Sequence, residues 1–471
     1  MGRGREGRRR AACRPCRAGG RPRRALPRAA RRLQGAALGR FRRGAAEERE
    51  RQDRPQARAR AVLARRHASR QLKESAMFDH LQRPEFVALR AAVLRFVDDE
   101  LRPIERELGL DSEDVWPRDV LRRVWQRSAA LGFYTASLPV EIGGQGLSIA
   151  EVCALKADLA ACGAALAPHV LGELGGPPRI GNMLKYATTA QLDRYFRPVM
   201  RGEKSTCFAL TEPHSGSDAM SIRTTAVEDG DALVINGTKH YISGAPFADF
   251  AIVMCVTDAT ATPPQITAVL VDLDLPGVSV QHEYVPMSGQ HIDADIRFVD
   301  VRVPRENVFG GVGNGFRLGM SRINVNRLLH CPTMLGLAMS AYRASLDHAR
   351  TRRQFGGPIA RFQAIQHMLA DMAAALWACE SMIAHTAALA DAGADLRMTA
   401  SACKLYVSER CFEVADKAVQ IHGNVGVTRG HPVEQTFRKL RMFRILTGTS
   451  EIQRNAIAKA ILDPAGAGRD A

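Results

Sequence analysis

Hydroxyl groups surround a glycine near the end of the chain, in the stretch FRILTGTSEIQRNAIAKAIL. Thr447 and Thr449 flank Gly448, and the carboxylate of Glu451 follows two residues later. Glycine allows a tight turn at such a position, and hydroxyl and backbone N–H groups there can donate hydrogen bonds to a ligand. The residue types indicate a binding turn, but they do not identify a reaction.

Two other segments carry side chains that could bind or catalyse. Arg352 and Arg353 stand beside a Gly-rich turn in RRQFGGPIARFQAIQ, where an arginine pair is usually only a solvated helix end. His330 and His422 each stand alone near a helical pattern, and such histidines are more often structural than catalytic. Function therefore has to be argued from the elements that position these residues.

The excess positive charge of the chain is confined to its beginning. The formal net charge is +17, but residues 1–70 hold 24 Arg, no Lys and 5 acidic residues. The other 401 residues hold 42 basic and 44 acidic side chains and are close to neutral. The basic balance therefore does not predict a nucleic-acid-binding surface on the folded part.

Residues 1–76 form an Arg-, Ala-, Gly- and Pro-rich leader that could not build a core. A transit peptide would be Ser-rich, yet Ser69 is the only serine in residues 1–70. A nucleic-acid-binding arm would carry stacking aromatics, and only Phe41 is present. The favoured interpretation is a misassigned start, with the natural chain beginning at Met77.

Cysteine usage and hydropathy indicate a soluble protein without a metal site. Apart from Cys13 and Cys16 the ten cysteines are scattered singly, and a lone CxxC is weak evidence for zinc. Free thiols suit a reducing compartment. No stretch approaches the ~18–20 uninterrupted apolar residues of a membrane span.

Helical spacing dominates two parts of the chain, with a strand-rich part between them. Residues 77–205 place apolar side chains three and four apart. In residues 206–310 the period changes to two, in runs such as FAIVMCVTD and QITAVLVDL, and helical spacing returns in residues 311–465. We predict an α+β multidomain fold with an N-terminal α-helical domain, a middle β-barrel or sandwich domain and a C-terminal four-helix bundle.

Two dipeptides in the strand-rich part have the composition of tight turns. Asp229-Gly230 and Asn236-Gly237 are each flanked by strand-like runs. Such dipeptides favour the two-residue turns of β-hairpins. We therefore expect a hairpin turn at each of them.

The stretch CFALTEPHSGSDAMSIRTTA (207–226) resembles the loop of acyl-CoA dehydrogenases that lies along the flavin and leads into the middle domain. Other stretches resemble further motifs in the family's order: KHYISG (239–244), FVDVRVPRENVFG (298–310), RRQFGGPIARFQAIQ (352–366) and QIHGNVGVTRGHPVEQTFRK (420–439). The resemblance covers roughly Met77 to Leu462. It implies an FAD-dependent oxidoreductase that acts on the Cα–Cβ bond of an acyl-CoA thioester.

The resemblance implies FAD contacts from several parts of the chain. The residues at the matching positions are Phe208, Leu210, Thr211, Tyr241, Ser243, Arg352, Gln354, Phe355, Gln363, Gln420, Gly423, Asn424, Thr449 and Glu451. The Leu210 backbone and the Thr211 hydroxyl would hydrogen-bond the flavin ring and favour its reduced, negatively charged form. Tyr241 and Ser243 replace the family's Trp and Thr, and Asn424 replaces a glycine but tolerates a left-handed conformation.

The same resemblance implies an acyl-CoA site without its catalytic carboxylate. Ser217, Asn324 and Arg327 match positions that contact the CoA-side ligand. The family keeps its glutamate base at one of two positions, which hold Thr447 and Asn326 here. Both side chains are neutral, although the Thr447 backbone N–H could still polarise a thioester carbonyl. His330 and His422 are candidates for a relocated base.

Several interpretations remain open. The first is an acyl-CoA dehydrogenase-like enzyme with a relocated base, the second a flavin reductase or oxidase on the same fold. The third is a base-less subunit that binds FAD and acyl-CoA and scaffolds an active paralogue. Because two of the motifs serve a neighbour's FAD in the family, a homotetramer or dimer of dimers is expected. Electron-transfer flavoprotein or another acceptor would reoxidise it, in the cytoplasm, or in the mitochondrial matrix if the leader is a transit peptide.

Overall fold

The computed structural model of the chain describes residues 78–281 and 284–462. Internal contacts divide the chain into two units, Met1–Ala76 and Met77–Ala471, and every described residue belongs to the second. The interpretations of the Arg-rich leader, with Cys13 and Cys16, therefore lie outside the described residues.

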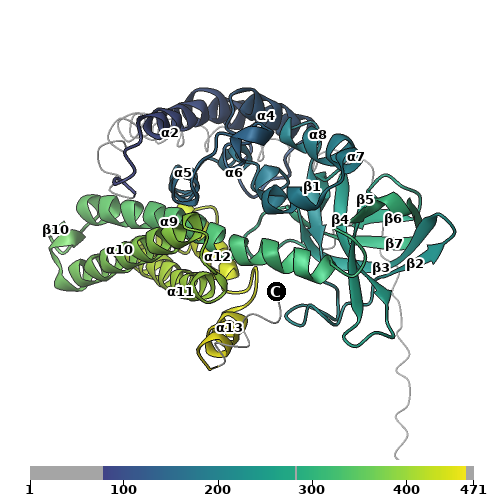
Figure 1. The fold of residues 1–471 in the computed structure, drawn as a ribbon. Coiled ribbons are helices and arrows are strands. Elements are labelled where there is room, and N and C mark those ends of the chain that lie inside the picture. The colour runs from purple at the N-terminus through teal and green to yellow at the C-terminus, as the bar shows by residue number, and fades with distance from the viewer. Residues whose placement is uncertain (1–77, 282–283, 463–471) are drawn as a thin grey trace, which may run out of the picture. The chain divides into compact units, whose positions relative to one another are not determined.

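Helices make up the N-terminal part of the described chain, as Figure 1 shows. The α-helices are α2 Pro84–Phe96, α3 Arg102–Leu108, α4 Arg118–Ala130, α5 Ile149–Ala161, α6 Ala167–Val170, α7 Thr189–Gln191 and α8 Arg197–Met200. Single turns of other helix types join them: η1 Val97–Leu101, η2 Val140–Ile142, η3 Pro177–Arg179, η4 Gly181–Tyr186 and η5 Leu192–Phe196.

Apolar spacing and end caps explain the two helices that organise this part. Phe86, Val93 and Phe96 form the buried face of α2, as their spacing predicts. Helix α5 begins where the Ser148 hydroxyl accepts from the Glu151 N–H while the Glu151 carboxylate accepts from the Ser148 N–H. Almost every residue of α5 is buried, so this helix lies inside the molecule.

The middle part forms one eight-stranded mixed sheet. Its strands are β1 Thr206–Ala209, β2 Thr225–Asp229, β3 Ala232–Ser243, β4 Phe250–Asp258, β5 Gln265–Asp272, β6 Val278–Gln281, β7 Asp293–Pro304 and β8 Val308–Phe309. The order is β6-β7-β3-β2-β4-β5-β8, and β1 pairs with β4. Strands β1 and β2 run parallel to β4, whereas the other pairs are antiparallel.

Strand β4 is buried on both faces, which explains its unbroken apolar sequence. Ala251, Val253 and Cys255 face a core to which most of the strands contribute. Ile252 and Met254 face a second core, shared with the N-terminal helices. The sheet is thus held between its own enclosed core and the helical part.

One of the two predicted hairpin turns is wrong. The turn after Asp229 joins β2 to β3 as predicted, but Asn236 and Gly237 lie inside β3. The register with β7 shifts there, and the Asn236 side chain bonds both the backbone N–H and the carboxylate of Asp300. The dipeptide forms a bulge because its polar side chain has a partner on the neighbouring strand.

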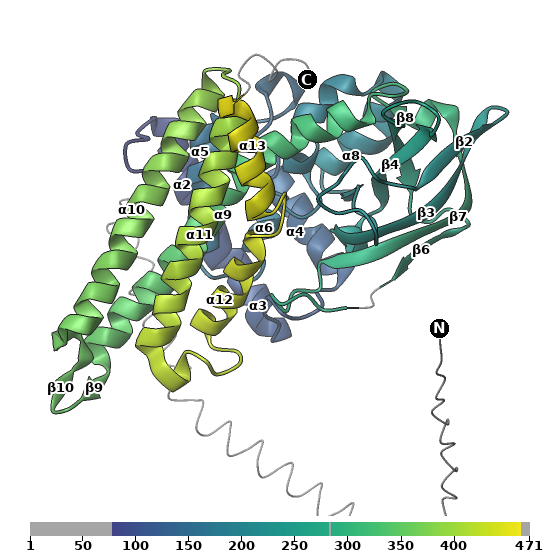
Figure 2. The ribbon, with the colours of Figure 1, turned by 90° about the horizontal axis from the view of Figure 1, so that it is seen from below.

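Long helices return in the C-terminal part (Figure 2). They are α9 Gly315–Thr351, α10 Gln363–Asp391, α11 Arg397–His422, α12 Pro432–Phe443 and α13 Ser450–Leu462, with a small hairpin of β9 Arg353–Gln354 and β10 Gly357–Pro358 between α9 and α10. The fourth helix of the predicted bundle is divided into α12 and α13. Of the described helices, α10 alone is long and apolar enough to cross a membrane, but it packs against α5, α9 and α11.

Helix α9 approaches α5 very closely at Gly336. A Cβ atom on Gly336 would lie 2.1 Å from the Ala157 carbonyl oxygen and 2.8 Å from the Ala160 side chain. Only glycine leaves room for this crossing, which fixes α9 against the buried helix of the N-terminal part.

We expect Gly336→Ala to lower the free energy of unfolding by about 1–3 kcal/mol through overpacking. Elsewhere in a helix the same change adds about 1 kcal/mol of helix propensity. Gly319→Ala is the matched control on α9, because its Cβ would meet only movable side-chain atoms, of Phe208 at 3.3 Å and Met254 at 3.7 Å. Urea unfolding of both variants measures the difference, and a stabilised Gly336→Ala would contradict the close crossing.

Candidate active site

The turn between α12 and α13 holds its backbone in the left-handed region at two successive residues. Thr447 has φ 55° and Gly448 has φ 91°. Glycine adopts such angles freely, whereas a β-branched residue does so at a cost of the order of 1–2 kcal/mol. Strain of this kind persists where surrounding contacts impose it and is frequent at functional sites.

Buried side chains of α11 and α13 impose this conformation. Lys404 is buried and donates from Nζ to the Gly448 carbonyl oxygen at 2.8 Å. The Gln453 amide donates to the carbonyls of Thr447 at 3.2 Å and Gly448 at 3.0 Å. Burial, with Arg327 nearby, lowers the pKa of Lys404 to about 8.

The predicted CoA-side residues of α9 lie next to this turn. Arg327 is buried and donates from Nη1 to Asn324 Oδ1 at 3.0 Å and to Ser401 Oγ at 3.2 Å. Its Nη2 lies 3.9 Å from where a Gly448 Cβ would stand. Its Nε has no partner among the described residues, and burial lowers its pKa. A buried cation without a counterion is suited to an anionic or polarised ligand.

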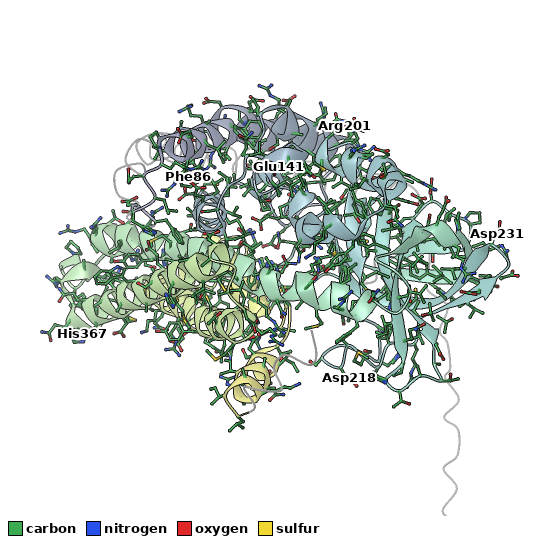
Figure 3. The ribbon with its side chains drawn as sticks, in the orientation of Figure 1. Phe86, Glu141, Arg201, Asp218, Asp231 and His367 are labelled. Atoms are coloured by element: carbon green, nitrogen blue, oxygen red, sulfur yellow. The ribbon has the colours of Figure 1, made fainter. Side chains whose placement is uncertain are left out.

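The loop after β1, marked by Asp218 in Figure 3, carries Leu210, Thr211 and the exposed Ser217. A buried ion pair fixes it: Lys239 Nζ lies 2.7 Å from Glu212 Oε1 and donates to the Leu210 carbonyl at 3.1 Å. Burial opposes the charge on Glu212, but Lys239 and nearby backbone N–H groups hold its pKa below the usual value. Sequence reasoning missed this pair.

Tyr241 and Ser243 lie on the last residues of β3. Tyr241 has φ 55° and its side chain is 58% exposed, while its N–H donates to Asp295 at 3.2 Å. The Tyr284 hydroxyl also donates to Asp295, at 2.9 Å, and the two tyrosine rings pack at 4.7 Å. The Ser243 hydroxyl is hydrogen-bonded to Asp293 rather than free, which the sequence did not predict.

These residues fit an isoalloxazine ring. Tyr241 presents an open aromatic face, and the Thr211 hydroxyl has no hydrogen-bond partner among the described residues. Phe208 lies on β1, two residues before Leu210. An aromatic wall with an unpaired donor is what a flat, hydrogen-bonding ring needs.

The predicted neighbour-side residues gather at the opposite end of α9. His348 on α9 stacks on His422 of α11 at 4.4 Å. This contact places the stretch that contains Arg352 next to the stretch that contains Gln420. The exposed residues there are Arg352, Gln354, Phe355, Gln363, Gln420, Gly423 and Asn424. Figures 1 and 2 place the hairpin of β9 and β10 at the end of the helical part away from the sheet, and His367 in Figure 3 marks this end. At 1.5 Å per residue, Arg352 lies about 37 Å along α9 from Arg327.

Two expectations about this end need correction. Gly423, with φ 62°, takes the positive φ, whereas Asn424 lies in the single turn η9 Gly423–Val425 without one. His422 cannot serve as the base beside Thr447 of the same chain, because its stacking partner His348 lies about 30 Å along α9 from Arg327.

His330 lies nearer the turn but is a poor base. Its ring packs against Phe443 at 5.9 Å. Burial, and the charges of cations such as Lys156, Arg179 and Arg322, lower its pKa to about 3. A neutral imidazole of such low basicity has little tendency to take a thioester α-proton.

Two further arginines escaped sequence reasoning. Arg179 on η3 donates to the Glu173 carbonyl at 2.9 Å and to the Ser243 carbonyl at 3.1 Å. Arg322 on α9 donates from Nε to the Arg179 carbonyl at 3.1 Å and lies 4.4 Å over the Phe208 ring. No local motif marks either arginine, because η3 and α9 meet only in the folded chain.

The family is established by comparison with known proteins. Three family models match in order: the acyl-CoA dehydrogenase N-terminal domain at residues 83–203, the middle domain at 207–301 and the C-terminal domain at 313–462. The chain therefore belongs to the acyl-CoA dehydrogenase family.

The individual relatives include proteins named as reductases and as dehydrogenases. The chain is 36% identical to caffeyl-CoA reductase-Etf complex subunit CarC of Acetobacterium woodii, over 74% of this chain and 90% of the relative. It is 32% identical to the mitochondrial short-chain specific acyl-CoA dehydrogenase of Mus musculus, over 86% and 97%. The structure of butyryl-CoA dehydrogenase from Megasphaera elsdenii matches with a TM-score of 0.72 and 26% identity, over 80% and 97%.

We expect Glu212→Gln to lower the free energy of unfolding by about 3–5 kcal/mol, because Lys239 would remain buried without its counterion. FAD should also be lost more readily, since the pair holds the Leu210 loop. The double variant Glu212→Gln/Lys239→Met is the control and should recover most of the loss. Because the pKa of Glu212 is lowered by folding, its contribution is full above the ordinary carboxyl pKa and falls as the pH drops through the folded value. Urea unfolding curves recorded at several pH values measure this contribution to the free energy of unfolding.

Proposed function

We propose that the chain is an FAD-dependent oxidoreductase acting on the Cα–Cβ bond of an acyl-CoA thioester, with the thioester lying at the Thr447–Gly448 turn. The observation that carries the proposal is this left-handed turn, held by Lys404 and Gln453 beside the buried Arg327, whose Nε has no partner among the described residues. Phe208, Leu210, Thr211, Tyr241, Thr449 and Glu451 are the proposed flavin contacts, with Ser217 and Asn324 on the CoA side.

When bound, FAD accepts a hydride from Cβ of the acyl group. The protein's part is to hold the thioester, with the Thr447 N–H and Arg327 drawing electron density toward its carbonyl. Neither Thr447 nor Asn326 can take the α-proton. The nearby carboxylate of Glu409 already has partners in the protein. It forms an ion pair with Arg444 at 2.9 Å and accepts a hydrogen bond from the Ser450 hydroxyl at 2.8 Å.

An added carboxylate at Thr447 tests the missing base. Thr447→Glu should raise the rate at which a simple saturated acyl-CoA, such as butyryl-CoA, reduces the flavin by roughly 10²–10⁴-fold, the usual worth of a positioned general base. Thr447→Gln is the control of equal size without a base. Anaerobic stopped-flow absorbance measures the rate. Fast reduction by the wild type, left unchanged in Thr447→Glu, would show that another base already acts.

We further propose that the exposed residues around Arg352 contact the FAD of a second subunit. Their distance along α9 from Arg327 supports this, since one flavin site could not include both. The apolar side chain of Phe355 agrees with this, because it is 87% exposed. A homodimer within a homotetramer is the proposed assembly.

Arg352→Ala should raise the dissociation constant for FAD roughly ten- to hundredfold, because a charge-assisted phosphate contact contributes about 1.5–3 kcal/mol. Arg350→Ala, two residues away and also exposed, is the control. Flavin content after gel filtration, with the mass of the assembly by light scattering, measures both proposals. Unchanged FAD retention in Arg352→Ala would remove this residue from the cofactor site.

Electron-transfer flavoprotein is the proposed redox partner, because the relative CarC is named as a subunit of a reductase–Etf complex. The cytoplasm, or the mitochondrial matrix, is the proposed location. A base-less scaffolding subunit is the second candidate, favoured by the neutral Thr447 and the low pKa of His330. Flavin reduction by an acyl-CoA in the purified protein distinguishes an enzyme from such a subunit.

A further inference from the structure

Arg179 and Arg322 form a cationic pair in which Asp293 and Glu173 act electrostatically on Arg179, whereas no carboxylate of the described residues acts on Arg322. Among the described residues, no carboxylate lies within ion-pair distance of either guanidinium. Their printed bonds are to carbonyl oxygens, of Glu173 and Ser243 for Arg179 and of Arg179 for Arg322. The nearby carboxyl of Asp293 is hydrogen-bonded to Ser243, and burial raises its pKa. Burial also lowers the pKa of Arg322 to about 9.

The pair lies beside the proposed reaction centre rather than at a distant surface. Arg179 bonds the carbonyl of Ser243, and Arg322 covers the ring of Phe208, so both touch residues of the flavin side. On α9, Arg322, Asn326 and His330 follow at intervals of four and therefore share one face. Arg322 thus lies about 6 Å along the helix from Asn326, where the family can carry its base.

Two half-buried guanidinium groups that share no anion are suited to a carboxylate, which accepts two parallel hydrogen bonds from such a group. The two cations repel each other, and Arg322 has no carboxylate of its own in the described part of the chain to offset its charge, so an anionic ligand would reduce the penalty. The neutral His330 does not compete for it. The pair is therefore suited to an anion, which an ordinary acyl chain does not carry.

Resting on the proposed function, we propose that the substrate is an acyl-CoA thioester with a carboxylate on Cα, held by Arg179 and Arg322. Loss of that carboxylate as CO2 takes the place of α-proton removal by a base. A malonyl-type thioester with an alkyl or arylalkyl substituent is the substrate class.

The step balances without a catalytic base. The Cα–carboxylate bond breaks and CO2 leaves, and its electron pair becomes the Cα=Cβ double bond. The hydride expelled from Cβ goes to the oxidised flavin, which is the two-electron acceptor. The products are an α,β-unsaturated acyl-CoA, CO2 and reduced flavin, and no side chain takes a proton. Thr447 and Asn326 can then be neutral, because the carbonyl needs only hydrogen-bond donors to stabilise the developing charge.

Binding without turnover tests the carboxylate site. Malonyl-CoA and acetyl-CoA differ by the carboxylate, and neither has a Cβ–H bond that could be oxidised. Calorimetric titration of the FAD-loaded protein should show malonyl-CoA binding at least tenfold more tightly. Arg322→Gln and Arg179→Gln should each lose this preference. Arg317→Gln, an exposed arginine of the same helix, should keep it.

Equal affinity for the two thioesters in wild type, or a preference that survives in both arginine variants, overturns the carboxylate site. Arg322→Lys guards against misfolding, since it should fold, hold FAD and keep part of the preference. If neither thioester binds and no FAD is retained, the proposed function fails first.

Turnover tests the position of the carboxylate. Ethylmalonyl-CoA should reduce the flavin anaerobically and release one CO2 and one crotonyl-CoA per flavin, whereas butyryl-CoA should react at least a hundredfold more slowly. Equal rates for the two, or reduction by ethylmalonyl-CoA with its carboxylate retained, overturn the decarboxylating step. Preferred binding and oxidation of glutaryl-CoA, with ethylmalonyl-CoA inert, overturns the placement on Cα.

Discussion

The close crossing of α9 and α5 at Gly336 fixes the helix on which most of the site depends. Helix α9 carries Arg322, Asn326 and Arg327 along its N-terminal half and ends beside the exposed residues around Arg352. A shift or rotation of this helix would move all of them together. Because the Gly336 backbone lies against a carbonyl of a buried helix, the orientation of α9 has little freedom.

The turn at Thr447 shows how the C-terminal part completes the site. A β-branched residue at φ 55° would not keep this conformation by itself, so Lys404 and Gln453 impose it through the carbonyls of the turn. The buried ammonium of Lys404 and the buried Arg327 also bring positive charge close to Thr447. The surroundings therefore favour negative charge on a ligand.

The positive charge near Thr447 can polarise the carbonyl group of a ligand, but it cannot remove a proton from that ligand. The relatives include proteins named as reductases and as dehydrogenases. Removing an α-proton requires a basic side chain, and His330 is only weakly basic because burial and surrounding cations lower its pKa to about 3. Arg179 and Arg322 instead favour an anion. In the proposed function, the charge of these groups selects among substrates.

The sequence by itself determined the order of helical and strand-rich parts, the family and the identity of the neutral residues at Thr447 and Asn326. Periodicity and motifs are local, so they are readable along the chain. Strand β4 matches its predicted run at both ends because its alternating faces are all apolar. Asn236-Gly237 was misread because its partner, Asp300, lies 64 residues away.

Only the tertiary structure decided which charged groups meet. Arg179 and Arg322 are 143 residues apart, and the contacts of Arg179 with Ser243 and of Arg322 with Phe208 exist only after three parts of the chain pack together. The same packing excluded His422, because its stacking partner His348 lies about 30 Å along α9 from Arg327. The burial of a titratable group and the charges near it depend on every element that packs around it. A sequence pattern shows only the neighbours along the chain, so it cannot predict them.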